Sequence, residues 1–320
     1  MNTFDLKIGF KCNNDCVHCV VAEKRPCGEL SLEELKNIVD TIPPSVDSIT
    51  ITGGEPTISP YFKDILKYCK SKGFKTSIQS NGTGFSSESL VKSTKDYIDH
   101  VHIAIHSSVE SVHDSIVKSK GMWKKTIKGL DNLIKYNIHF TTQTVLSRLN
   151  VETLPETFAF IQSKKPGTQM SMTYPHMMGN AFENRADICF KYSEYKHIFH
   201  QCLKNYKGLI FTESIPPCIL FPYEEYPNAI LEVIIQKSLM DKNCRNRIGV
   251  DFSGTFDVID YNFMDVKDRR KLPKCKDCAF NTLCIGVWKE YVDLYKNCID
   301  LHPITKEMYY SKNKKGYSIC

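Results

Sequence analysis

Hydrophobic and polar positions follow two periods along the first two thirds of the chain, one typical of strands and one typical of helices. Short apolar or alternating stretches predict strands at residues 4–10, 48–52, 75–79, 100–105, 139–146 and 169–173. Apolar positions three and four residues apart predict helices at about residues 32–40, 59–72, 87–97, 109–117, 123–136, 154–163 and 192–206. Ser31 and Glu34 have the spacing of a capping box at the first helix. The pattern therefore predicts six strand-then-helix units.

Strands that are separated by helices form parallel sheets with right-handed crossovers. The predicted fold class is α/β, a partial (β/α)6 TIM-like barrel with a small Cys-rich C-terminal domain, and the chemistry is expected at the carboxyl ends of the strands. The alternating pattern stops near Ser214, where the sequence becomes rich in Pro and Cys, so we predict domains at residues 1–213 and 214–320. Within the second domain the pattern favours a helix at 229–240 and a hairpin at 247–260 that turns at Ser253-Gly254.

The composition is that of an ordinary globular chain of 320 residues, with 42% hydrophobic and 24% charged residues. No stretch approaches the roughly 18 apolar residues of a membrane helix, and the N-terminal residues lack the pattern of a signal peptide. The net charge of +6 is spread along the chain, so a nucleic-acid partner is not expected. We expect a cytoplasmic protein without membrane contact.

The chain contains fourteen cysteines, and most fall into one early and one late group. In a reducing compartment such groups indicate metal or redox chemistry rather than disulfides, whereas the isolated Cys69, Cys189 and Cys202 are expected to be buried apolar side chains. Cys12, Cys16 and Cys19 read C-x3-C-x2-C directly after the first predicted strand. Three thiolates leave one metal position without a protein ligand. The spacing alone leaves iron and zinc open, with Cys27 a candidate fourth ligand for zinc.

A second motif, Gly53-Gly54-Glu55-Pro56, follows the second predicted strand. Paired glycines let the backbone approach a small ligand, and a glutamate can accept hydrogen bonds from an ammonium group. With C-x3-C-x2-C after the first strand and GGEP after the second, the sequence resembles the radical S-adenosylmethionine (radical SAM) superfamily over roughly residues 4–180.

The resemblance implies that Cys12, Cys16 and Cys19 hold three irons of a 4Fe-4S cluster, whose fourth iron is chelated by S-adenosylmethionine. It implies that the methionyl amine meets the GGEP stretch, and that polar residues ending later strands touch the carboxylate and ribose. By position, these cofactor-binding residues are Gly53, Gly54, Glu55, Pro56, Ser80, Asn81, His106 or the adjacent Ser107, and Asn150. Many relatives carry Asp where this chain has His106-Ser107. From the residues alone, 80–82 also fits a simple turn and Asn150 a helix cap. Residues 174–181 resemble the sixth-strand loop that packs against the adenosine.

The chemistry implied by the resemblance needs an external one-electron reductant such as flavodoxin or ferredoxin. Reductive cleavage of S-adenosylmethionine gives methionine and a 5′-deoxyadenosyl radical, which abstracts a hydrogen atom from the substrate. The protein must hold the substrate close and exclude competitors.

The late group contains Cys275, Cys278 and Cys284 in the spacing C-x2-C-x5-C, which by itself also fits a zinc loop. Placed after a radical SAM core, it resembles the C-terminal auxiliary-cluster domains called SPASM and twitch. The chain has Ile259 and Trp288 where a full SPASM motif has cysteines, so the resemblance implies one auxiliary 4Fe-4S cluster rather than two. We predict Cys218 as its fourth ligand, with Cys298 as the rival and Cys244 and Cys320 as further candidates.

The predicted function is a radical SAM enzyme of oxidoreductase type that oxidises or cross-links a ribosomally made peptide or protein. One alternative is a radical SAM enzyme that acts on a small metabolite or cofactor precursor. A second is a non-catalytic zinc or iron–sulfur binding module. The sequence identifies no general acid or base.

Overall fold

The computed structural model describes residues 3–223, 247–251, 257–260, 268–282, 284–296 and 300–314. The helix predicted at 229–240 lies outside the described residues, as do the turn at Ser253-Gly254 and three cysteines, Cys244, Cys298 and Cys320.

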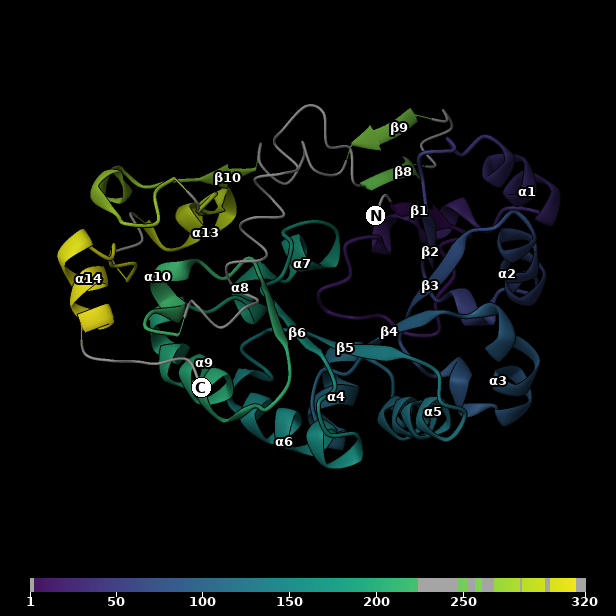
Figure 1. Ribbon diagram of the computed structural model, residues 1–320, viewed down its shortest axis with the longest axis horizontal. Helices are drawn as coiled ribbons and strands as arrows, with labels where there is room; N and C mark the ends of the chain where they lie inside the picture. Colours follow the sequence, from purple (N-terminus) through teal and green to yellow (C-terminus); the bar gives the residue numbers. More distant parts are fainter. Residues whose placement is uncertain are drawn as a thin grey trace.

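A curved parallel sheet forms the centre of the protein, and helices cover its outer face (Figure 1). Seven strands lie side by side in chain order, each parallel to the next. They are β1 (Thr3–Lys7), β2 (Ser48–Thr52), β3 (Lys75–Ser80), β4 (His100–Ala104), β5 (Phe140–Val145), β6 (Met170–Thr173) and β7 (Ile210–Glu213). The α/β fold with a partial barrel is therefore confirmed, with β7 as a strand that the sequence pattern did not reveal.

A hairpin from late in the chain extends this sheet beyond its first strand. β8 (Arg247–Asp251) pairs parallel with β1, and β9 (Asp257–Asp260) pairs antiparallel with β8. The predicted hairpin is thus present, and it extends the barrel sheet. This pairing was not predicted, because a local pattern indicates a hairpin but not the strand with which the hairpin pairs. The division into domains at residue 214 stays a prediction.

Most of the predicted helices are present and lie between consecutive strands. They are α1 (Leu32–Asp40), α2 (Phe62–Ser71), α3 (Glu88–Thr94), α4 (Glu110–Val117), α5 (Met122–Lys135), α6 (Leu154–Lys164) and α9 (Lys196–Asn205). The capping box of Ser31 and Glu34 is formed at the start of α1. Two short helices, α7 (Asn180–Glu183) and α8 (Arg185–Ile188), follow β6. Among the described residues no helix combines the length and hydrophobicity that a membrane crossing requires.

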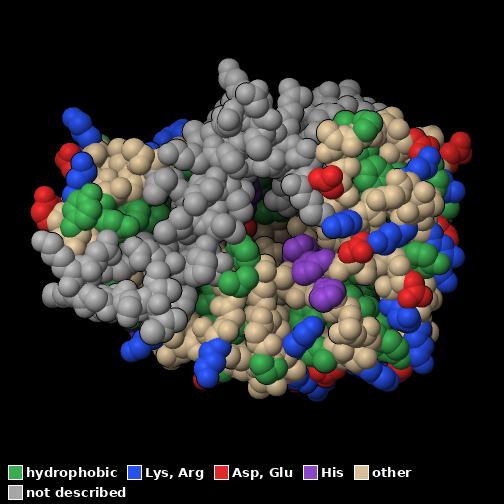
Figure 2. All heavy atoms as spheres, in the orientation of Figure 1, with side chains coloured by type: hydrophobic (Ala, Val, Ile, Leu, Met, Phe, Trp, Pro, Cys, Tyr) green, Lys and Arg blue, Asp and Glu red, His purple; other side chains and the backbone are tan. Residues whose placement is uncertain are grey.

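The two faces of the sheet differ in chemistry. Apolar strand residues such as Leu6, Ile51 and Ile103 are fully buried in the core beneath the helices. Because side chains alternate between faces, the next residues along each strand lie on the inner face. Many of these are polar, and His102 Nδ1 is 2.8 Å from Thr141 Oγ1 across β4 and β5. Figure 2 shows histidine side chains gathered beside a hollow in one face of the molecule. Cys69, Cys189 and Cys202 are buried, as predicted.

The C-terminal segment packs against the barrel. It contains α10 (Pro217–Leu220), the antiparallel pair β10 (Arg269–Arg270) and β11 (Val287–Trp288), α13 (Lys289–Leu294) and α14 (Lys306–Lys314). Tyr291 contributes to this contact, since its hydroxyl accepts a hydrogen bond from the backbone N–H of Tyr192 at 3.1 Å. Its ring lies 5.9 Å from that of Tyr174, measured between centroids.

Candidate cofactor sites

The first cysteine group lies on the loop that leaves the carboxyl end of β1. Cys12, Cys16 and Cys19 are half-buried and form no disulfide. The loop backbone is anchored to the end of α4, because Asp15 and Val17 donate from their N–H groups to carbonyls of α4 at 2.9 Å. The loop is therefore held by the fourth unit of the barrel as well as by its own strand.

The loop after β6 anchors the same cysteines from the other side. The backbone N–H of Asn180 donates to the carbonyl oxygen of Cys19 at 2.9 Å, and its Nδ2 donates to that of Cys16 at 3.0 Å. Gly179 allows this approach, since a Cβ there would lie 2.6 Å from the Cys19 carbonyl oxygen. Residues 174–181 are expected near the adenosine from their resemblance to the sixth-strand loop, and no sequence pattern indicates this contact with the cysteine loop.

The three thiols are close enough to influence one another electrostatically. Burial raises the pKa of Cys16 to about 12, and repulsion from Cys19 and Cys12 adds to the effect. The pKa of Cys12 is also raised, mainly by burial. Thiols that resist ionisation together become thiolates when cationic metal shares their site, so this donor set fits an iron–sulfur cluster.

The paired glycines of GGEP pack directly on the backbone that leads into the cysteine loop. A Cβ on Gly53, whose φ is +129°, would lie 2.1 Å from the carbonyl oxygen of Gly9. A Cβ on Gly54 would lie 2.1 Å from that of Lys11. Hydrogen bonds of 2.9 Å from Gly54 N–H to Gly9 and from Glu55 N–H to Lys11 complete the contact. The glycines are thus required for the end of β2 to pack on the segment that leads into the cysteine loop, a role that the sequence pattern does not indicate.

The carboxylate of Glu55 is only 2% exposed and is held by several protein donors. Its Oε1 accepts from Ser80 Oγ at 2.8 Å and Thr57 Oγ1 at 2.5 Å, and its Oε2 accepts from the backbone N–H of Asn81 at 2.6 Å. Burial raises the pKa of Glu55, and these hydrogen bonds oppose that rise. The structure therefore brings Glu55, Ser80 and Asn81 together as one network. Asn81 Nδ2 continues it to Asn13 Oδ1 on the cysteine loop, at 2.8 Å.

Asn150 connects the ends of β4 and β5. Its Nδ2 donates to the carbonyl oxygens of His106 at 2.8 Å and Val145 at 2.9 Å, and its Oδ1 accepts from the backbone N–H of Ser147 at 2.7 Å. The side chain is 1% exposed. These contacts give Asn150 a structural role, and a contact with S-adenosylmethionine stays a prediction.

His106 belongs to a group of three buried histidines beside the cysteine loop. Its ring lies 4.6 Å from His18 and 5.5 Å from His113, measured between centroids. Burial lowers the pKa of His18 and of His113 to about 4, and that of His106 well below its usual value, so all three are neutral at pH 7. Ligand atoms of Cys16, His18 and His106 lie within 4.8 Å of one another. His18 was visible inside the cysteine motif, whereas no sequence signal pointed to His113.

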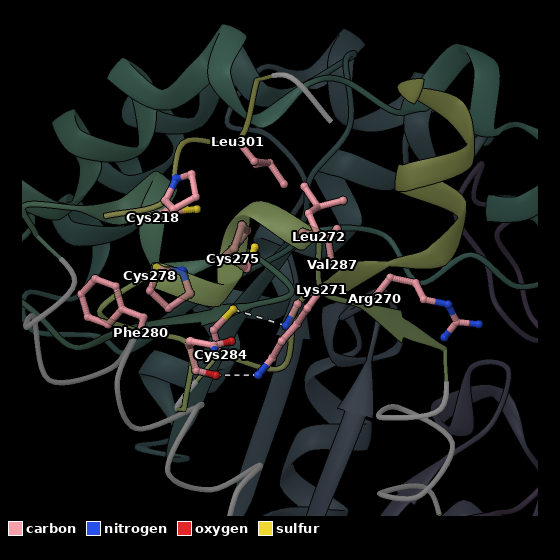
Figure 3. A pocket seen from close by; sticks show the side chains of 15 residues that line it. Cys218, Arg270, Lys271, Leu272, Cys275, Cys278, Phe280, Cys284, Val287 and Leu301 are labelled. Atoms are coloured by element: carbon pink, nitrogen blue, oxygen red, sulfur yellow. Dashed lines mark hydrogen bonds between the residues drawn. The ribbon is translucent and has the colours of Figure 1, made fainter. Parts of the chain in front are cut away.

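The second cysteine group surrounds one pocket in the C-terminal segment. Figure 3 shows Cys218, Cys275, Cys278 and Cys284 around the same space. Cys218 comes from α10, which follows β7, and the other three come from the segment between β10 and β11. The pKa of Cys218 is raised by burial and then by the neighbouring Cys284, Cys278 and Cys275. The structure thus places Cys218 with the C-x2-C-x5-C motif.

Gly286 shapes the last part of this pocket. Its N–H donates to Cys284 Sγ at 3.3 Å, and its φ is +96°. A Cβ at this position would lie 2.2 Å from the carbonyl oxygen of Arg270. Four half-buried thiols with a backbone donor to sulfur fit a second iron–sulfur cluster.

Residues 6–161 match the Radical SAM superfamily model. The chain contains a radical SAM domain. Its curated relatives include the AdoMet-dependent heme synthase of Methanosarcina barkeri, 29% identical over 150 residues, which are 46% of this chain and 43% of that protein. They also include the Mycofactocin maturase MftC of Mycolicibacterium smegmatis, 31% identical over 168 residues, 51% of this chain and 42% of the maturase. The matched part is less than half the length of these relatives.

Solved structures share the fold of the radical SAM domain and of the segment that follows it. SuiB of Streptococcus suis, bound to the precursor peptide SuiA, has a TM-score of 0.60 at 14% identity, covering 92% of this chain and 73% of SuiB. Native anSMEcpe with bound AdoMet has a TM-score of 0.63 at 15% identity, covering 98% of this chain and 95% of that one.

Proposed function

We propose that the protein is a radical SAM enzyme in which Cys12, Cys16 and Cys19 hold a 4Fe-4S cluster. The observation that supports it is the cysteine loop itself, where three half-buried thiols are fixed by the GGEP glycines and by Asn180 at the carboxyl edge of a radical SAM domain. With S-adenosylmethionine and an electron from a flavodoxin or ferredoxin, such a cluster supplies a 5′-deoxyadenosyl radical.

The protein residues fix the position of the cofactor and shield it. The network of Glu55, Ser80 and Asn81 holds the ends of β2 and β3 in place, and Asn150 does the same for β4 and β5. We propose that these strand ends contact S-adenosylmethionine. The neutral histidines His18 and His106 provide buried, uncharged groups beside Cys16.

A second 4Fe-4S cluster is proposed at Cys218, Cys275, Cys278 and Cys284. Four protein thiolates satisfy all four irons, so this cluster would accept an electron from the substrate rather than bind the substrate directly. That role makes the overall reaction an oxidation or an oxidative cross-link.

The proposed substrate is a ribosomally made peptide or protein. Support comes from SuiB bound to its precursor peptide among structures of the same fold, and from the Mycofactocin maturase MftC among the relatives. A small metabolite or cofactor precursor is the second candidate, favoured by the similarity to heme synthases. A short peptide encoded beside this gene that changes mass on incubation with the enzyme would support the first.

The deciding experiment is anaerobic reconstitution followed by dithionite and S-adenosylmethionine. Wild type and the exposed-cysteine variant C27A should both form 5′-deoxyadenosine, whereas the triple variant C12A/C16A/C19A should form none. Iron and sulfide near eight each per wild-type chain would agree with two clusters. Product formation by the triple variant, or its absence from reconstituted wild type, would contradict the proposal. A C27A variant that loses bound zinc would instead favour the zinc module.

A further inference from the structure

The pair β10 and β11 separates the late cysteine pocket from the carboxyl edge of the barrel. Arg269 lies opposite Trp288 in this pair, and Arg270 lies opposite Val287. Neighbouring residues of a strand point to opposite faces. Arg270 and Val287 line the cysteine pocket, as Figure 3 shows, so Arg269 and Trp288 lie on the other face.

That other face meets the loops after β6 and β7. Arg269 Nη2 donates to the Oγ of Ser214, the first residue after β7, at 2.6 Å. The ring of Trp288 lies 3.9 Å from that of His176, which follows β6. His176 is four residues before Asn180, which binds the cysteine loop, so the two are at most about 14 Å apart along the chain. Arg269 is therefore at the same edge of the barrel as the first cysteine group.

Arg269 is a buried cation with one hydrogen-bond donor, its Nε, that has no partner among the described residues. The residue is 6% exposed, and its guanidinium carbon lies 3.5 Å from the ring centroid of Trp288. Within the described parts of the chain it forms no ion pair with a carboxylate. The neighbouring Asp268 pairs instead with Lys289 at 2.6 Å. Arg269 Nε and the indole Nε1 of Trp288 are both buried without a hydrogen-bond partner among the described residues.

A buried guanidinium without an anion is unfavourable, and its planar fork matches a carboxylate. We propose that Arg269 and Trp288 form a binding site for a carboxylate of the substrate, at the barrel edge between the two cysteine groups. The inference rests on the proposed function, because it narrows the proposed substrates to those that carry a carboxylate. On a peptide that group is the C-terminus or the side chain of Asp or Glu, and Arg269 would bind either.

Trp288 provides a reporter for this site, since the chain has only two tryptophans. The variant W123F leaves Trp288 as the single fluorophore in the full, reconstituted chain, with S-adenosylmethionine present throughout. The probes, titrated at constant ionic strength, are N-acetyl-alanine with a terminal carboxylate, N-acetyl-glutamate amide with a side-chain carboxylate, and N-acetyl-glutamine amide with none. A saturable change in Trp288 fluorescence with at least one carboxylate probe, and none with the neutral probe, is expected. The stronger carboxylate probe identifies the source.

In the W123F background, R269Q should weaken carboxylate binding about tenfold or more, because it removes a charged hydrogen-bond donor. R269K keeps the positive charge but not the planar fork, so its affinity for the carboxylate probe should lie between those of W123F alone and R269Q. This variant provides a second test if R269Q does not fold. Equal responses to charged and neutral probes in W123F, or no response to any, would overturn the inference. So would carboxylate binding by R269Q as tight as that of W123F alone or, where R269Q does not fold, binding by R269K as tight as that of W123F alone. The fluorescence titration does not require S-adenosylmethionine cleavage, and the 5′-deoxyadenosine assay does not require these probes. The carboxylate site and the proposed radical SAM activity can therefore fail independently.

Discussion

Replacing Gly54 with alanine should disrupt the packing of the end of β2 on the cysteine loop. The new Cβ would lie 2.1 Å from the Lys11 carbonyl oxygen, so the two segments must separate by about 1.3 Å to reach the ordinary contact distance of 3.4 Å. Such overpacking costs about 1–3 kcal/mol. The separation also breaks the hydrogen bonds from Gly54 and Glu55, both 2.9 Å long, at about 1 kcal/mol each. We therefore expect G54A to lose about 3–5 kcal/mol of unfolding free energy.

For a chain of this size the loss corresponds to a fall in Tm of about 4–7 °C in the apo protein. Because this packing positions Cys12, reconstituted G54A should also lack about four irons, those of the first cluster, and should keep the irons of the second cluster. The control is G73A, whose glycine has a φ of +87° but no atom within 4 Å of an added Cβ. It should cost only about 1–2 kcal/mol of backbone strain and keep all its iron. A G54A protein with full iron content and a Tm like that of wild type would refute the reasoning.

Three further variants test other parts of the structure. The pKa of His113 is lowered from 6.5 to about 4, so its neutral form stabilises the fold above pH 6.5 and this stabilisation is lost as the pH falls toward 4. Wild type should therefore lose unfolding free energy between pH 7 and pH 5, and H113Q should lose about 2 kcal/mol less over the same range in urea titrations. A loss in H113Q equal to that of wild type would contradict the lowered pKa of His113. C218A should bind about four fewer irons than C27A, and equal iron in the two would exclude Cys218 as a ligand. N150A leaves the His106 carbonyl oxygen without its donor and should lose about 2–4 kcal/mol in urea unfolding, whereas a loss below about 1 kcal/mol would show that the side chain does not hold the strand ends.

The sequence predicted the barrel better than its edges. Six strands and their helices were recognisable because each has a clear apolar period of its own. β7, Ile210–Glu213, was missed because it lies directly before the Pro- and Cys-rich stretch at which the strand–helix pattern ends. The pairing of β8 with β1 could not be predicted, since the local sequence of a strand does not specify which distant strand it pairs with.

The cysteines and glycines of the candidate sites were visible because they occur in fixed local spacings. The groups that hold them in place were not. Asn180 reaches the cysteine loop from 164 residues away, and an isolated asparagine has no signature in the sequence. Arg269 had none either, because its burial and its contact with Trp288 depend on how the C-terminal segment folds against the barrel.

The pairing of β8 with β1 has a consequence for synthesis on the ribosome. One side of β1 gains its neighbour β2 early, but the other side waits for residues 247–251 to emerge. Until then a nascent chain exposes the hydrogen-bonding groups of that strand, which can pair with another chain. Stalled or truncated translation products should therefore aggregate through the strand that leads into the first cysteine group, and cluster assembly would be safest after the ribosome has released the finished polypeptide.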